Sequence, residues 1–439
     1  MADAPDPIQH AIAEILDTLT AALPRPLGDR LGADVRTLKE LLMEARPPKL
    51  MIVGRRGAGK SSLINAILGQ KVAEVGSVLS QTGAPTWYSC ATAQGELRLL
   101  DTRGLGDSSH PESANFHDAL QEIEAALADE APDCLLFLCK AKEVDARIGE
   151  DIDNILEVRR YVHKKHGYDL PVVAVVTQVD ELDPKRVEPP YADAAKQAHI
   201  ATAVAAVGAA LAGRGLPLVR VLPVSAYAEY GEDGESGTGL GNGGEPGAVR
   251  IYDNYWNIDL LVDYLVEQLP QSAQLQLARL TRQRTVQERL ARRLTGAAAT
   301  LCAGVAAVPI PVADILPITG LQIGLISAIA YVSGREMSRQ SAREFLVAMG
   351  ANVGAAFALR EGARALIKVL FPGGGSAISA GVAFAGTWGI GEAAIAYFIL
   401  GRSIGEAKRL LRRRVKEAAA EAGEPPAPPT SPTSGGAAT

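Results

Sequence analysis

The stretch from Gly54 to Ser61 reads GRRGAGKS and fits the pattern G-x-x-x-x-G-K-[ST]. An apolar run at 50–53 precedes it and an apolar, helix-periodic run at 63–68 follows it, so a glycine-rich turn is predicted to connect a buried strand to a helix. Its glycines permit a tight turn that aims backbone N–H groups at phosphate oxygens, and the positive end of the helix adds to that field. A chance glycine turn is the alternative, but strand, loop and helix in register favour a phosphate-binding loop.

Each residue of this loop has an expected role. Lys60 would reach the β- and γ-phosphates of a nucleotide, and the hydroxyl of Ser61 would ligate Mg²⁺. The other expected contacts come from the loop and from the start of the helix: Gly54, Gly57, Ala58, Gly59 and Ser62. The loop therefore predicts a nucleotide ligand without identifying its base.

Strands and helices are predicted to alternate between residues 49 and 269. The expected strands are Leu50–Val53, Thr86–Thr92, Glu96–Leu100, Cys134–Cys139, Val172–Val176 and Leu218–Val224. The expected helices are Ser61–Leu68, Glu112–Ala128, Glu150–Lys165, Asp193–Ala212 and Ile258–Leu269. This alternation is typical of an α/β domain with a mainly parallel sheet that is covered on both faces. The glycine-rich segment Tyr230–Gly247 is expected to be a surface loop.

Charge is distributed unevenly along the 439 residues. The net charge is −6, but the segment from Pro270 onward holds 19 Lys and Arg against 10 Asp and Glu, which is +9, so residues 1–269 carry −15. An acidic front half disfavours nucleic acid as its partner. The four cysteines form no C-x-x-C pair and the N-terminal segment has no secretory pattern, so a reducing, cytoplasmic location is expected.

Two downstream segments have the pattern of loops that sense a nucleotide. The run Leu99–Gly104 is a predicted strand ending in D-x-x-G, in which Asp101 would hold Mg²⁺ through water and the Gly104 N–H would sense the γ-phosphate. Thr82 lies in a polar loop 22 residues after Lys60, and its hydroxyl and carbonyl would close on Mg²⁺ and the γ-phosphate. Thr86 is an alternative for that role.

The sequence Thr177-Gln178-Val179-Asp180 follows the predicted strand Val172–Val176 and is expected to select the base. A carboxylate accepts two hydrogen bonds from the N1 and N2 donors of guanine, whereas adenine has no such donor pair. Asp180 is therefore the expected guanine-reading residue. The dipeptide Ser225-Ala226, after the last predicted strand, would complete the base pocket through a backbone N–H.

Together these motifs resemble those of the Era-like GTPases of the translation-factor class, over about residues 49–269 and most densely in GRRGAGKSSLINAILGQKVAEV. The resemblance implies GTP and GDP as ligands, Mg²⁺ as cofactor and hydrolysis of GTP to GDP and phosphate. It implies that Lys60, Thr82 and Gly104 act in catalysis and that Ser61, Thr82 and Asp101 hold the metal. It also implies that Asp180 binds guanine.

Three departures from the family pattern bear on the mechanism. Gln178 replaces a lysine, so we expect one wall of the base pocket to lose a long stem and guanine selectivity to be less strict. Gly57 stands where many relatives have an asparagine associated with potassium-assisted hydrolysis. Leu105 stands where Ras-like enzymes have a glutamine that orients water, so slow turnover without an activator is expected.

Arginine is the expected substitute for the missing charge stabilisation. Arg55 and Arg56 lie inside the phosphate loop and Arg103 lies inside D-x-x-G. One of them is hypothesised to act as an arginine finger in cis or across a nucleotide-dependent homodimer, and Arg56 is the candidate. The alternative for each is a solvated arginine or an ion pair with the acidic surface.

The chain outside the α/β domain is predicted to be helical. Apolar residues recur at helical spacing in the N-terminal 48 residues, and Ser272–Leu294 reads as one basic helix. In the apolar region 296–401, the runs Gly296–Ala313 and Ile315–Gly334 are interrupted by prolines and flanked by arginines, which favours a membrane hairpin whose ends stay in the cytoplasm. A soluble bundle with an Ala/Gly core is the alternative.

The apolar region resembles an uncharacterised bacterial domain that has a P-x-P-x-x-D turn, here Pro309–Asp314, and that is fused to Era-like GTPases. The predicted domains are a helical preface 1–48, a GTPase domain 49–269, an all-α domain 270–420 and a disordered tail 421–439.

The sequence thus predicts a GTP switch with slow hydrolysis. We expect the Thr82 loop and the segment Leu105–His110 to relay its nucleotide state to a C-terminal helical module at the inner face of the cell membrane or on a protein partner. A soluble RNA or ribosome-assembly GTPase, and a scaffold that binds nucleotide without turnover, are the alternatives.

Overall fold

The computed structural model describes residues 25–71, 85–101, 116–144, 148–216, 219–231, 249–281, 283–306, 315–335, 342, 345 and 380–423. The chain divides into two compact units. The first, called the α/β unit here, comprises residues 39–290 and 331–335. The second, called the helical unit, comprises residues 1–38, 291–330 and 336–439.

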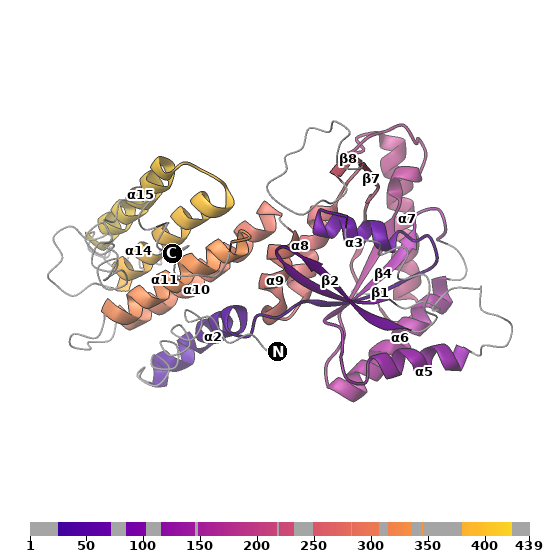
Figure 1. Ribbon diagram of the computed structural model, residues 1–439, viewed down its shortest axis with the longest axis horizontal. Helices are drawn as coiled ribbons and strands as arrows, with labels where there is room; N and C mark the ends of the chain where they lie inside the picture. The colour runs from indigo at the N-terminus through magenta and orange to yellow at the C-terminus, as the bar shows by residue number, and fades with distance from the viewer. Residues whose placement is uncertain are drawn as a thin grey trace, which may run out of the picture. The chain divides into compact units, whose positions relative to one another are not determined.

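The α/β unit is built on a six-stranded sheet (Figure 1). Its strands lie in the order β2-β3-β1-β4-β5-β6. Its strands are β1 Lys49–Gly54, β2 Thr86–Thr92, β3 Gly95–Asp101, β4 Cys134–Lys140, β5 Val172–Thr177 and β6 Val221–Pro223. All neighbouring strands pair in parallel except β2, which runs antiparallel to β3 at the edge. The prediction of a mainly parallel sheet is confirmed.

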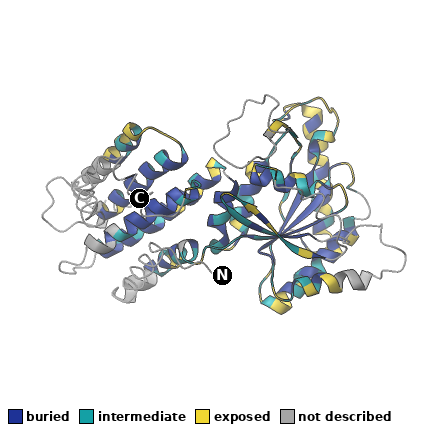
Figure 2. Cartoon of the chain, in the orientation of Figure 1, coloured by how far each residue is buried: buried dark blue, intermediate teal, exposed yellow. Residues whose placement is uncertain are grey.

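Helices cover both faces of this sheet because its central strands are apolar on both sides. Every residue of β5, and all of β4 except Lys140, is buried (Figure 2). On one face α5 Phe116–Ala126, α6 Ile148–His166 and α7 Ala194–Ala212 share a core with alternate residues of β1, β4 and β5. The helices α3 Lys60–Leu68, α8 Ile258–Gln268 and α9 Gln271–Thr281 contact one another, and α9 also contacts β3. The short 3₁₀ helix η1 Val179–Glu181 follows β5.

Two expected elements differ from the structure, and one further element was not expected. The predicted basic helix Ser272–Leu294 is two helices, α9 and α10 Arg284–Ala306. Arg279 is buried at 7% exposure, because its guanidinium donates to the carbonyl oxygens of Gln94 and Tyr331 and lies over the Tyr331 ring. The last predicted strand is shorter, as β6 begins at Val221. An unpredicted antiparallel ribbon forms from β7 Ala228–Gly231 and β8 Val249–Asp253.

The helical unit contains parts of α2 Arg25–Leu42, α10 and α11 Ile315–Val332, with α14 Ala380–Ala394, the π-helical turn η2 Ile395–Ile399 and α15 Ile404–Gly423. Small residues let its helices approach closely: a Cβ on Gly391 would overlap Thr295, and one on Gly304 would overlap Leu31. Inside the unit, the Gln322 amide donates to the buried Thr387 hydroxyl at 3.0 Å. The prediction of a helical C-terminal part is confirmed.

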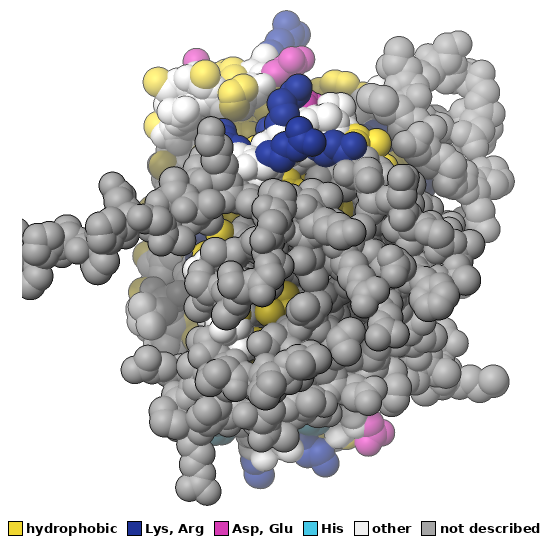
Figure 3. Space-filling view, turned by 90° about the vertical axis from the view of Figure 1, so that its left-hand side faces the viewer, with side chains coloured by type: hydrophobic (Ala, Val, Ile, Leu, Met, Phe, Trp, Pro, Cys, Tyr) yellow, Lys and Arg dark blue, Asp and Glu magenta, His cyan; other side chains and the backbone are white. Residues whose placement is uncertain are grey.

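The structure gives no support to the expected membrane hairpin. Within the described ranges, no helix is long and apolar enough to cross a membrane. The helix α11 covers most of the second apolar run, whereas the end of the first run and the turn Pro309–Asp314 lie outside the described residues. Exposed arginines occur on and just before α15, and Figure 3 shows Lys and Arg side chains close together near the upper edge of one face.

Candidate nucleotide-binding site

The phosphate loop lies between β1 and α3, at the carboxyl end of the sheet. Gly57 and Gly59 have φ angles of +76° and +82°, in the left-handed region that favours glycine. A Cβ on Gly54 would lie 2.9 Å from the Leu138 carbonyl oxygen, so the loop also needs glycine where it leaves the strand. The backbone therefore requires glycine at all three positions.

Lys60 and Asp101 lie close together although 41 positions separate them in the sequence. Parallel pairing places Ile52 of β1 opposite Asp101 at the end of β3. The Lys60 ammonium donates to the Gly54 carbonyl at 2.8 Å and lies 3.9 Å from an Asp101 carboxylate oxygen. Ser61 follows Lys60 in the first turn of α3 and is partly buried, whereas Ser62 is exposed.

This pair of elements offers the type of ligands that Mg²⁺ prefers. Asp101 supplies a carboxylate that is 6% exposed, and Ser61 supplies a hydroxyl from the adjacent helix. Hard oxygen donors of this kind, completed by water and nucleotide phosphates, suit Mg²⁺. Thr82, Arg103, Gly104 and Leu105 lie outside the described residues, so their expected roles stay predictions.

The end of β5 holds the phosphate loop from the side. The Thr177 hydroxyl, which is buried, donates to the Ala58 carbonyl at 2.9 Å. Gln178 has a left-handed backbone, and its side-chain amide donates to the Gly57 carbonyl at 2.7 Å. The sequence led us to expect that glutamine here shortens one wall of the base pocket. The structure adds that this side chain reaches the phosphate loop and anchors it.

Asp180 is positioned by Ser225. The Ser225 hydroxyl is fully buried and donates to an Asp180 carboxylate oxygen at 2.9 Å. The Ser225 backbone is itself held by two hydrogen bonds with Trp256, of 3.2 and 3.0 Å. The dipeptide Ser225-Ala226 was expected to act through a backbone N–H. In the structure the Ser225 N–H donates to the Trp256 carbonyl, and the Ser225 side chain orients the Asp180 carboxylate. Ala226 follows it and is partly buried.

Lys196 of α7 supports the same loop and could not be identified from the sequence, where it reads as a solvated helix lysine. Its side chain is completely buried. The ammonium donates to the carbonyl oxygens of Asp180 at 2.8 Å and Leu182 at 2.5 Å, and lies 5.1 Å from the centre of the Tyr191 ring. Burial lowers the pKa of Lys196, and the nearby carboxylate of Asp180 partly offsets this.

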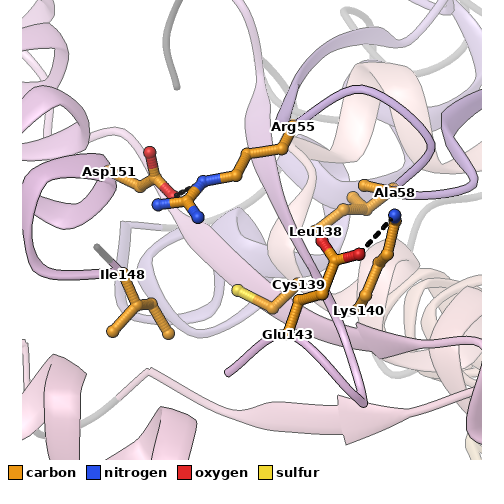
Figure 4. A pocket seen from close by; sticks show the side chains of 8 residues that line it. All are labelled: Arg55, Ala58, Leu138, Cys139, Lys140, Glu143, Ile148 and Asp151. Atoms are coloured by element: carbon orange, nitrogen blue, oxygen red, sulfur yellow. Dashed lines mark hydrogen bonds and ion pairs between the residues drawn. The ribbon is translucent and has the colours of Figure 1, made fainter. Parts of the chain in front are cut away.

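Arg55 points away from the loop toward α6. Its guanidinium forms an ion pair of 3.1 Å with Asp151, whose side chain is 9% exposed. Figure 4 shows this pair at a shallow pocket that is partly open to solvent and whose opposite side carries Lys140 and Glu143. This arrangement matches the ion-pair alternative considered for Arg55, whereas Arg56 is exposed.

Comparison with known proteins yields two family matches. Residues 49–178 match the family described as 50S ribosome-binding GTPase, and residues 271–423 match the family described as a domain of unknown function, DUF697. The GTPase Era of Xanthomonas campestris pv. campestris is 31% identical over 194 residues, which are 43% of this chain and 59% of that protein. Translocase of chloroplast 34 of Pisum sativum is 28% identical over 107 residues, which are 24% of this chain and 32% of that protein.

The chain thus spans 32% to 59% of the length of these two curated relatives. Among solved structures, Toc33 from Arabidopsis thaliana matches with 17% identity and a TM-score of 0.34, covering 59% of this chain and 95% of that one. The first family match includes the phosphate loop and the strand that ends at Asp101, and the second includes the helices from α9 to α15. The chain therefore contains a P-loop GTPase domain similar to Era, matched over residues 49–178, and a helical C-terminal part that matches the DUF697 family over residues 271–423.

Proposed function

We propose that this protein is a guanine-selective switch that binds GTP and GDP with Mg²⁺ and hydrolyses GTP slowly. The observation that supports this best is the connection between the two halves of the site. Thr177 and Gln178 bond to the phosphate loop, while Asp180, two residues further on, is oriented by Ser225. A base bound at Asp180 and phosphates bound at the loop would therefore be held by one continuous, hydrogen-bonded frame.

In this proposal each described residue has a physical task. The loop glycines and the start of α3 surround the phosphates with N–H donors, and Lys60 exchanges the Gly54 carbonyl for phosphate oxygens. Ser61 and Asp101 hold Mg²⁺, which supplies positive charge to the phosphates when bound. Slow hydrolysis rests on Leu105, which cannot orient water.

Asp180→Asn tests the guanine assignment. The carboxylate accepts from the N1 and N2 donors of guanine, whereas an amide offers a donor suited to the C2 carbonyl of xanthine. We expect the variant to lose about 100-fold or more in GTP affinity, since each lost charge-assisted hydrogen bond is worth about 1.5–3 kcal/mol, and to gain affinity for XTP. Competition between fluorescent GDP and unlabelled GTP, XTP or ATP measures this. Unchanged GTP affinity in the variant, or equal ATP and GTP affinity in the wild type, would refute it.

We further propose that nucleotide state is relayed to the helical unit through the Thr82 loop and the segment 105–110, and that this unit binds a protein partner or a membrane surface. Partitioning between soluble and membrane fractions, for the full chain and for a chain lacking 296–401, tests whether the partner is a membrane surface. Recovery of the full chain entirely in the soluble fraction would exclude the membrane surface and leave the protein partner.

An RNA-binding role through the basic helices is the second candidate, and one observation weakens it. Arg279 is buried, while Arg289 pairs with Asp263 and Arg292 pairs with Glu392. Arginines engaged in this way have less charge to offer a phosphate backbone, so the exposed arginines of α15 would have to supply RNA binding. RNA affinity that is unaffected by substituting those arginines would exclude this role.

A further inference from the structure

A second lysine lies against the phosphate loop. Lys140 is the last residue of β4, in register with Thr177 of β5. Its ammonium nitrogen lies 3.2 Å from the place that a Cβ on Gly57 would occupy, and its Cε lies 3.3 Å from it. Gly57 is an exposed residue in the middle of the loop, and Gln178 holds its carbonyl from the neighbouring strand. Gly57 is therefore contacted both by the last residue of β4 and by the residue that follows β5.

This position places a positive charge next to the expected phosphates. Backbone N–H groups of such a loop bond phosphate oxygens at about 2.9 Å, so a group in contact with Gly57 is within a few ångströms of them. The lysine stem is flexible and its ammonium is a compact charge with three donors, which lets it follow a change in the ligand. Lys60 already approaches the phosphates from the helix side, and Lys140 would approach from the β4 side.

Lys140 is easier to release from its resting partner than Arg55. Its ion pair is with Glu143, three residues further on, at 2.7 Å, and the Glu143 side chain is 49% exposed. Water replaces lysine around an exposed carboxylate at little cost. Arg55, in contrast, pairs with an Asp151 side chain that is only 9% exposed, and its departure would leave a buried carboxylate without this partner. Figure 4 shows the two ion pairs separately.

We propose that Lys140 is a catalytic residue for GTP hydrolysis, and that Arg55 serves as a structural tie between the loop and α6. This inference rests on the proposed function. In the reaction, the oxygen of water forms a bond to the γ-phosphorus, while the bond from that phosphorus to the β–γ bridging oxygen breaks and its electron pair stays with GDP. The proton of the water ends on the released phosphate or in solvent. Lys140 leaves Glu143, keeps its own protons and stabilises the charge that develops on the phosphate oxygens.

The test compares single-turnover hydrolysis of GTP by the full-length wild type, Lys140→Met and Lys140→Arg. Methionine keeps the length of the stem without its charge, and we expect the rate to fall by about 100-fold, at the lower end of the range found when one charge-stabilising donor is removed. Affinity for GDP should stay within about threefold, because the charge acts mainly as the bond breaks. Lys140→Arg retains the charge and should keep at least about a third of the rate.

Two controls make the outcome specific. Lys142→Met removes a lysine two residues away that pairs with Glu181 at 3.7 Å, and its rate should equal that of the wild type. Glu143→Gln frees the ammonium, and its rate should equal or exceed that of the wild type. A Lys140→Met rate within threefold of wild type would overturn the inference, as would equal losses in Lys142→Met or a parallel loss of GDP affinity and thermal stability. If the wild type itself binds or hydrolyses no GTP, the proposed function fails instead.

Discussion

Replacing Lys196 by methionine perturbs the segment 180–182, which contains the expected guanine-binding residue Asp180. Lys196 itself is not expected to contact the nucleotide. Methionine fills a similar volume, but the carbonyl oxygens of Asp180 and Leu182 lose the donor that now lies at 2.8 and 2.5 Å. Leaving a buried acceptor unsatisfied costs about 1–3 kcal/mol, so the two carbonyls together amount to about 2–6 kcal/mol. The variant no longer buries an ammonium, and this gain offsets part of the loss, as the lowered pKa of Lys196 indicates.

We therefore expect a net destabilisation of about 2–3 kcal/mol, which lowers the melting temperature of a unit of this size by about 4–12 °C. GDP affinity should also fall by about tenfold, because Asp180 loses the backbone support that orients its carboxylate. Thermal unfolding with and without GDP, together with fluorescent GDP titration, measures both quantities. Lys185→Met is the matched control, as Lys185 is exposed in the same segment. A variant as stable and as tight in GDP binding as the control would refute the reasoning.

The same lysine predicts a pH dependence with a defined sign. Burial lowers the pKa of Lys196 in the folded protein below the model-peptide value of 10.5, so in the alkaline window below 10.5 the unfolded chain binds more protons than the folded one. The free energy of unfolding should therefore rise with pH in that window. Deprotonation does not break the contacts of Lys196, since a neutral amine still has two N–H donors for the two carbonyls. Denaturant titrations of the wild type and of Lys196→Met give the difference in their free energies of unfolding at each pH. We expect this difference to rise with pH, and a difference that falls with pH would contradict the prediction.

Three further predictions concern the phosphate loop and its surroundings. Gln178→Ala removes the 2.7 Å bond to the Gly57 carbonyl and should weaken GDP binding by about 3–10-fold in fluorescence titration, whereas Gln178→Lys should retain binding. Asp151→Asn breaks the ion pair with Arg55 and should lower the free energy of unfolding by about 1–3 kcal/mol in urea titration, without changing the GTPase rate; a rate gain instead would assign the released Arg55 to catalysis. Burial raises the pKa of the Cys139 thiol to about 12, so this thiol should resist iodoacetamide at pH 8 in the folded protein, and rapid native-state labelling there would contradict its burial.

The phosphate loop and the parallel sheet could be predicted because their signals are local. Gly54, Gly57 and Gly59 report backbone angles or close approaches that other residues do not tolerate, and these requirements hold wherever the loop lies in space. Hydrophobic runs such as 134–139 report strands buried on both faces. The division of Ser272–Leu294 into two helices was missed, because its apolar periodicity continues across the break.

The sequence by itself determined which ligand class the chain can take: a phosphate loop, a D-x-x-G aspartate and the carboxylate Asp180 follow predicted strands in an order that a parallel sheet brings to one edge. Only the tertiary structure decided the partners of the long, flexible side chains. Gln178 reaches Gly57, Arg55 turns to Asp151, and Lys140 lies over the loop. The physical reason is that sequence spacing fixes the direction of a strand or a helix face, while the contacts of a lysine, arginine or glutamine depend on which distant segment folds within its reach.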